Sequence, residues 1–119
     1  MDSLITRELA GFIGTTQYHR LTQRVLVTDG VRYLADRAHC YWLLFLYASH
    51  LSAMDGTQDS FTVLKLIRSG DSAEITIEDG NDRILASQRV EYTDFPMPKI
   101  QLYGVWEADH WITMLPSEY

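Results

Sequence analysis

Residues 38–54 contain no Asp, Glu, Lys or Arg, and this block constrains the fold more than any other feature of the sequence. It reads AHCYWLLFLYASHLSAM and contains neither Gly nor Pro. A continuous apolar run that extends past twelve residues favours a helix over a buried strand. We therefore expect a helix over about 37–53 that lies across a sheet, with its outer face available to a partner.

An acidic segment follows this block directly. Residues 55–82 contain seven acidic residues and two basic ones, which sum to a local charge of about −5. Such a field attracts cationic partners and repels nucleic acid. The acids that surround one predicted strand and its turns form the candidate partner-binding face: Asp71, Glu74, Glu78, Asp79 and Asp82. The alternative is a solvated strand face, and the spacing of an EF-hand calcium loop is absent.

The composition indicates a single small domain spanning residues 1–119. The net charge of −6 and the pI near 5.0 argue against direct binding to DNA or RNA phosphates. Cys40 is the only cysteine, which suits a reducing cytoplasm. We expect a cytoplasmic protein, because the N-terminus lacks a signal-peptide core and the apolar stretch 40–48 is too short to span a bilayer.

The rest of the chain predicts an α+β fold in which two helices pack on an antiparallel β-meander of about five to six strands. The first helix is expected over about 4–13, and a hairpin over 24–35 is expected to turn at Asp29-Gly30, a favoured type I′ dipeptide. Alternating side chains and Gly-containing turns predict the later strands at 61–68, 73–78, 83–92, 100–106 and 110–115.

No residue pattern predicts a catalytic residue, a cofactor site or a metal site. The four histidines have no ligand spacing, and the glycines form no phosphate-binding motif. Cys40 follows His39, but adjacent residues on a helix point about 100° apart, so the imidazole does not readily reach the thiol. A small buried core residue is the favoured interpretation of Cys40.

Several stretches together resemble a family of small uncharacterised bacterial proteins that often occur on plasmids, phages and other mobile elements. These stretches are residues 12–18 (FIGTTQY), 28–35 (TDGVRYLA), 41–44 (YWLL), 48–50 (ASH), 79–81 (DGN), 92–96 (YTDFP) and 115–119 (LPSEY). The resemblance implies a domain of unknown function and brings no catalytic residues. Phe45 stands where members of the family often have an acidic residue.

Three functional hypotheses follow. The first is a protein-binding mobile-element inhibitor of the anti-CRISPR type, which docks its acidic face on a basic nucleic-acid-binding groove of a host complex. The second is an interaction module, monomeric or homodimeric, that uses the apolar helix with Trp42 and Phe45. The third is a small-ligand binder or enzyme with a pocket between helix and sheet. Its expected lining is Tyr41, Tyr33, Asp94 or His50.

Overall fold

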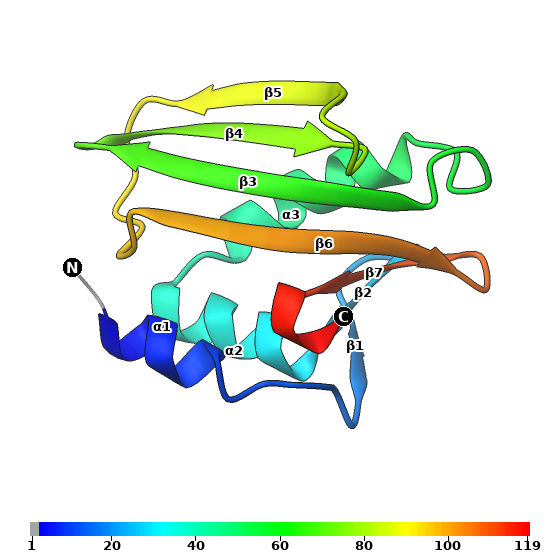
Figure 1. The fold of residues 1–119 in the computed structure, drawn as a ribbon, viewed down its shortest axis with the longest axis horizontal. Helices are drawn as coiled ribbons and strands as arrows, with labels where there is room; N and C mark the ends of the chain where they lie inside the picture. The colour runs from blue at the N-terminus through cyan, green and yellow to red at the C-terminus, as the bar shows by residue number, and fades with distance from the viewer. Residues whose placement is uncertain (1–2) are drawn as a thin grey trace.

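The computed structural model describes residues 3–119, in which three helices accompany one seven-stranded sheet (Figure 1). The helices are α1 (Ser3–Leu9), α2 (Asp29–Ala38) and α3 (Tyr41–Ser52). The strands are β1 (Tyr18–Arg20), β2 (Val25–Thr28), β3 (Phe61–Ser69), β4 (Ser72–Glu78), β5 (Ile84–Val90), β6 (Lys99–Glu107) and β7 (His110–Met114). A 3-10 turn, η1 (Pro116–Glu118), follows β7. No helix within residues 3–119 is long and apolar enough to cross a bilayer.

The α+β class is confirmed, but the sheet is larger than predicted and is not purely antiparallel. Its strand order is β1-β2-β7-β6-β3-β4-β5, and β2 pairs with β7 in parallel. All other neighbouring strands are antiparallel. β1 and β2 extend the sheet beyond β7 (Figure 1). β2 coincides with the first arm of the hairpin predicted over 24–35, whereas β1 was not predicted.

The hairpin predicted at Asp29-Gly30 is wrong, because β2 runs directly into α2 at that point. Thr28 is extended, with φ −80° and ψ 172°, and its hydroxyl accepts a hydrogen bond from the Val31 N–H at 3.3 Å. The carboxylate of Glu118 accepts one from the Gly30 N–H at 3.1 Å. These two bonds satisfy main-chain donors that are free at every helix N-terminus, so they stabilise a helix where the dipeptide alone favours a turn.

The helix predicted over 37–53 corresponds to α3, but α3 begins later than predicted, because Arg37 and Ala38 form the last turn of α2. His39 adopts a left-handed conformation, with φ 52° and ψ 46°, and its N–H bonds the carbonyl of Ala35, which ends α2. The chain turns at Cys40 and α3 begins at Tyr41. The first helix is also shorter than predicted, and Ile13 is 83% exposed, so it does not continue the buried stripe of α1.

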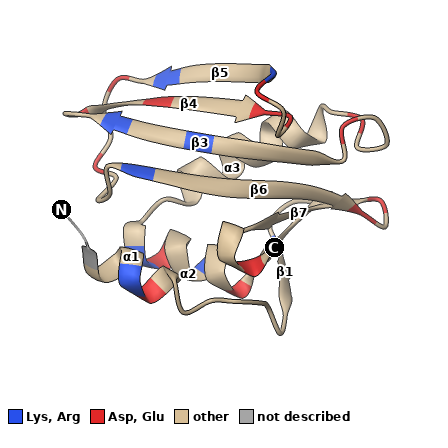
Figure 2. Cartoon of the chain, in the orientation of Figure 1, with Lys and Arg blue, Asp and Glu red and all other residues tan. Residues whose placement is uncertain are grey.

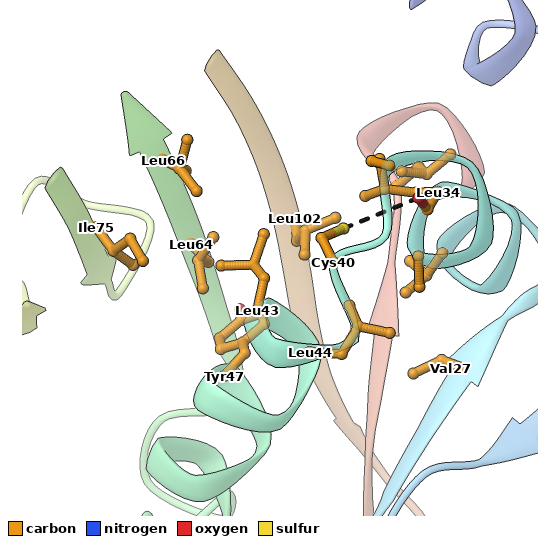
Figure 3. Close-up of a cluster of buried hydrophobic side chains, with 14 of the residues drawn as sticks. Val27, Leu34, Cys40, Leu43, Leu44, Tyr47, Leu64, Leu66, Ile75 and Leu102 are labelled. Carbon is orange, nitrogen blue, oxygen red and sulfur yellow. Dashed lines mark hydrogen bonds between the residues drawn. The ribbon is translucent and has the colours of Figure 1, made fainter. Parts of the chain in front are cut away.

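The core lies between α3 and the middle strands of the sheet (Figure 3). In this view Leu43 and Tyr47 of α3 point toward Leu64 of β3, and all three side chains are buried. The Tyr47 hydroxyl lies 2.6 Å from that of Thr62, which satisfies both buried groups. The alternation predicted for β4 is confirmed, because Ile75 and Ile77 are buried whereas Glu74 is exposed.

Candidate functional site

The outer face of α3 leaves large apolar side chains in contact with solvent. Phe45 is 50% exposed and Tyr41 is 39% exposed, while Trp42 and Leu46 are half-buried. We refer to these four residues as the α3 face. The helix contains no Asp, Glu, Lys or Arg, so no charged side chain of α3 covers these apolar residues. An apolar helix face of this kind is typical of a binding surface.

A hollow of about 520 Å³ adjoins the α3 face at Trp42. Three segments that are far apart in sequence line it: the start of α3, the β3–β4 turn, and the end of β5 with the link that follows it. The lining residues are Trp42, Asp71, Val90, Tyr92, Thr93 and Asp94. We refer to this site as the Trp42 hollow.

The Trp42 hollow unites residues that the sequence analysis assigned to three different hypotheses. Trp42 belonged to the predicted apolar interface, Asp71 to the acidic face and Asp94 to the pocket of an enzyme. Tyr92, which is 85% exposed, and Thr93 were not predicted as site residues. No local sequence pattern identifies Tyr92 as a site residue, because only folding brings the link after β5 beside α3.

The carboxylates of the Trp42 hollow have no cationic partner within residues 3–119. Neither Asp71 nor Asp94 takes part in an ion pair in this part of the chain. Nearby cations are engaged elsewhere: Arg68 donates a hydrogen bond to the Phe95 carbonyl at 2.6 Å. Arg89 bonds two other carboxylates, which raise the pKa of its guanidinium. Within the described residues, the two carboxylates of the hollow therefore have no ion-pair partner.

The five acids predicted as one partner-binding face are divided between the two ends of β4 and its outer side (Figure 2). Asp71 precedes the strand, whereas Asp79 and Asp82 follow it, roughly 20 Å away for a strand of this length. Glu74 pairs with Arg89 at 3.0 Å, and Glu78 pairs with Lys65 at 3.2 Å; both ion pairs connect neighbouring strands. The charge of the strand face itself is thus largely compensated.

Acidic residues also gather at one end of the central strands, where three connections lie (Figure 2). We refer to this region as the acidic end. The α3–β3 loop and the β4–β5 turn contribute two carboxylates each, and the end of β6 and the following turn contribute one each: Asp55, Asp59, Asp79, Asp82, Glu107 and Asp109. Some of these groups have local structural roles. Asp79 accepts hydrogen bonds from two main-chain N–H groups of its own turn, and bonds from Thr57 hold the pKa of Asp55 below its usual range.

A polar network at the start of α2 joins that helix to β1. The Asp29 carboxylate lies 2.8 Å from Nε2 of His19 and accepts hydrogen bonds from the N–H and hydroxyl of Thr16. The contact with His19 and the bonds from Thr16 hold the pKa of Asp29 well below its usual range. Nδ1 of His19 is 3.1 Å from Arg32, so both ring nitrogens have partners and the ring is held between α2 and β1.

Cys40 is a buried core residue, as the sequence predicted. Its side chain has no exposed surface, and its sulfur lies 3.8 Å from the carbonyl of Leu34 (Figure 3). Burial raises the pKa of the thiol to about 12, which suppresses the reactive thiolate. Within residues 3–119, no group of three or more His, Cys, Asp or Glu side chains is arranged to hold a metal ion.

The four residues proposed to line an enzyme pocket do not converge. The Tyr41 hydroxyl donates a hydrogen bond to Asp36 at 2.9 Å. The Tyr33 ring packs on Phe12 at a centroid distance of 5.2 Å. His50 lines a separate hollow of about 290 Å³. Asp94 alone reaches the Trp42 hollow.

These features define a small α+β protein with a mixed sheet and an exposed aromatic helix face. The chain belongs to a family of unknown function, DUF6876, whose model matches residues 3–119. The match confirms the resemblance to an uncharacterised domain, whereas a bacterial or mobile-element origin stays a prediction. No curated protein and no solved structure matches the chain.

Proposed function

We propose that this chain is a non-enzymatic protein-binding domain that docks its partner on the α3 face. The observation that carries the proposal is the exposure of Phe45 and Tyr41 on a helix without charged residues. Aromatic side chains supply much of the affinity at protein interfaces, because they bury a large area at a small cost in conformational entropy. The core is already filled by other residues of α3, so folding does not require these two side chains to be apolar.

A more specific form of the proposal concerns the partner. On this hypothesis the chain is a mobile-element inhibitor of the anti-CRISPR type, and its acidic surface docks on a basic nucleic-acid-binding groove of a host complex. The net charge of −6 and the six carboxylates of the acidic end support this choice. Electrostatic attraction would then set the association rate and the orientation, and the α3 face would supply most of the affinity.

The test is a pull-down from bacterial lysate with three versions of the tagged protein: wild type, Phe45→Glu and Ile13→Glu. Ile13 is the matched control, because it is also an exposed apolar residue and lies outside the α3 face. The proposal expects one partner that Phe45→Glu loses and Ile13→Glu retains. Equal capture by all three versions would exclude the α3 face as the docking surface.

Two further measurements separate the specific alternatives. A nucleic-acid-binding partner that is released at high salt supports the inhibitor hypothesis, because exposed charge pairs are screened. A homodimer through the α3 face is the alternative partner, and light scattering after size exclusion tests it. In that case the wild type has twice the monomer mass and Phe45→Glu has the monomer mass.

A further inference from the structure

The Trp42 hollow combines two aromatic side chains with two carboxylates in a space suited to a side chain. Its volume of about 520 Å³ lies within the range of ligand pockets. Trp42 and Tyr92 provide ring surface, and Asp71 and Asp94 provide negative charge. The site therefore differs from a solvated cluster of acids, because its two carboxylates lie beside aromatic rings in one hollow.

The two carboxylates of the hollow are available to a cation from outside the chain. Within residues 3–119 neither Asp71 nor Asp94 forms an ion pair, and the neighbouring Arg68 and Arg89 are engaged with other acceptors. A cation that enters the hollow can contact a carboxylate and an aromatic face together. Both contacts favour a positive charge, since ring faces carry negative electrostatic potential.

Arginine fits this combination better than lysine. Its guanidinium group is planar, so it stacks on an aromatic ring while its N–H groups donate paired hydrogen bonds to a carboxylate. A lysine ammonium is compact and strongly hydrated, and it gains less from stacking. Two aromatic rings and two carboxylates therefore favour a guanidinium group.

The position of the hollow indicates that the arginine belongs to a protein. Trp42 lines the hollow and is also part of the α3 face, and Phe45 follows it by one helical turn. A partner that covers Phe45 with apolar side chains brings its neighbouring residues over the hollow. We propose that the Trp42 hollow binds an arginine side chain of the partner that docks on the α3 face. This inference rests on the proposed function and names the chemistry of the partner.

The test follows the indole N–H of Trp42 by NMR while N-acetyl-arginine amide is added to the full chain. The Trp42→Phe variant assigns this signal, because the chain has two other tryptophans. The neutral isostere N-acetyl-citrulline amide and N-acetyl-lysine amide are the comparison ligands. We expect a saturable shift with the arginine probe, a weaker affinity for the lysine probe and no saturable shift with the citrulline probe.

The double variant Asp71→Asn, Asp94→Asn should weaken arginine binding roughly tenfold, because it removes the charge and keeps the side-chain shape. Asp82→Asn, beyond the other end of β4, is the matched control and should leave the affinity unchanged. The inference is overturned by a citrulline response equal to that of arginine, by the absence of any shift, or by equal weakening in the double variant and the control. Equal binding of lysine and arginine would overturn the choice of guanidinium.

The pull-down distinguishes failure of this inference from failure of the proposed function. If the Asp71→Asn, Asp94→Asn variant captures the partner as well as the wild type while Phe45→Glu does not, the docking surface stands and the arginine site does not. If the double variant and Phe45→Glu both lose the partner and Asp82→Asn retains it, both proposals are supported. If no variant changes capture, both are wrong.

Discussion

The helices α2 and α3 are neighbours in sequence and share one hydrophobic core. They nevertheless differ in what they expose to solvent, because α2 exposes charged residues and α3 exposes aromatic ones. α2 buries Val31 and Leu34 and exposes Arg32 and Asp36, so it has one apolar side. α3 buries a comparable set of residues and still exposes aromatic side chains, Phe45 foremost among them. The comparison teaches that covering the sheet requires only one apolar side of a helix. The second apolar side of α3 therefore needs a reason outside the fold, which is the basis of the proposed docking surface.

The helices also differ in how their first turns are stabilised. Thr28 and Glu118 provide hydrogen-bond acceptors for the first turn of α2. The residue before α3, Cys40, makes no side-chain capping bond. α2 thus depends on polar contacts with the distant C-terminus, whereas α3 depends on apolar burial.

The largest expected effect is on the buried side of α3. Leu44→Ala removes a side chain that is almost fully buried, so it should lower the free energy of unfolding by about 2–5 kcal/mol, from lost burial and the cavity it leaves. Urea denaturation followed by circular dichroism measures this change. A loss below about 1 kcal/mol would mean that the core around α3 is loosely packed.

The next effect tests the dependence of α2 on the C-terminus. Glu118 contacts the Thr28 hydroxyl at 2.6 Å and accepts hydrogen bonds from the N–H groups of Gly30 and Leu115. Glu118→Ala leaves these groups without their acceptor and should destabilise the protein by about 1–3 kcal/mol in the same assay. Glu118→Gln is the matched control and should cost less, because it keeps one acceptor oxygen. Equal losses would show that α2 requires both carboxylate oxygens of Glu118 as acceptors.

A smaller, pH-dependent effect is expected at Asp29. Since the folded protein lowers the pKa of this carboxyl, its contribution to stability is complete above the unfolded pKa of about 3.9 and is lost as the pH falls below that value. Wild type should therefore exceed Asp29→Asn in stability most at neutral pH, and the difference should shrink below about pH 4. Thermal unfolding of both proteins, measured from neutral pH to below about pH 4, gives this difference in stability. A difference that is constant with pH would contradict the role of the Asp29 charge.

The smallest expected effect on stability is on the exposed side of α3. Phe45→Ala should change the free energy of unfolding by no more than about 0.5 kcal/mol, because half of the side chain already contacts water. Phe45→Ala should strongly reduce partner capture while hardly changing stability, whereas a core variant such as Leu44→Ala should mainly lower stability. If Phe45→Ala destabilises the protein as much as Leu44→Ala does, the aromatic surface serves the fold and the comparison of the two helices fails.

Part of the candidate site could be predicted from the sequence. The sequence names Trp42, Phe45 and Asp71 as candidates, and the structure leaves each of them at least partly exposed, with Trp42 and Asp71 lining one hollow. Their grouping was not predicted, because Asp71 was assigned to a face with acids that lie beyond the far end of β4. Tyr92 was not predicted as a site residue, since no local pattern marks a residue that only the folded chain brings beside α3.

By itself, the sequence determined the α+β class, the core side of β4 and the buried state of Cys40, because burial preferences and alternation are local properties of the chain. Only the tertiary structure decided that Asp29-Gly30 begins a helix and that β2 pairs with β7 in parallel. Glu118 shows the physical reason: its carboxylate accepts hydrogen bonds from the Thr28 hydroxyl and the Gly30 N–H, about ninety residues earlier in the chain. Local propensity cannot include a contact of that range, and here the contact outweighs the preference of the dipeptide for a turn.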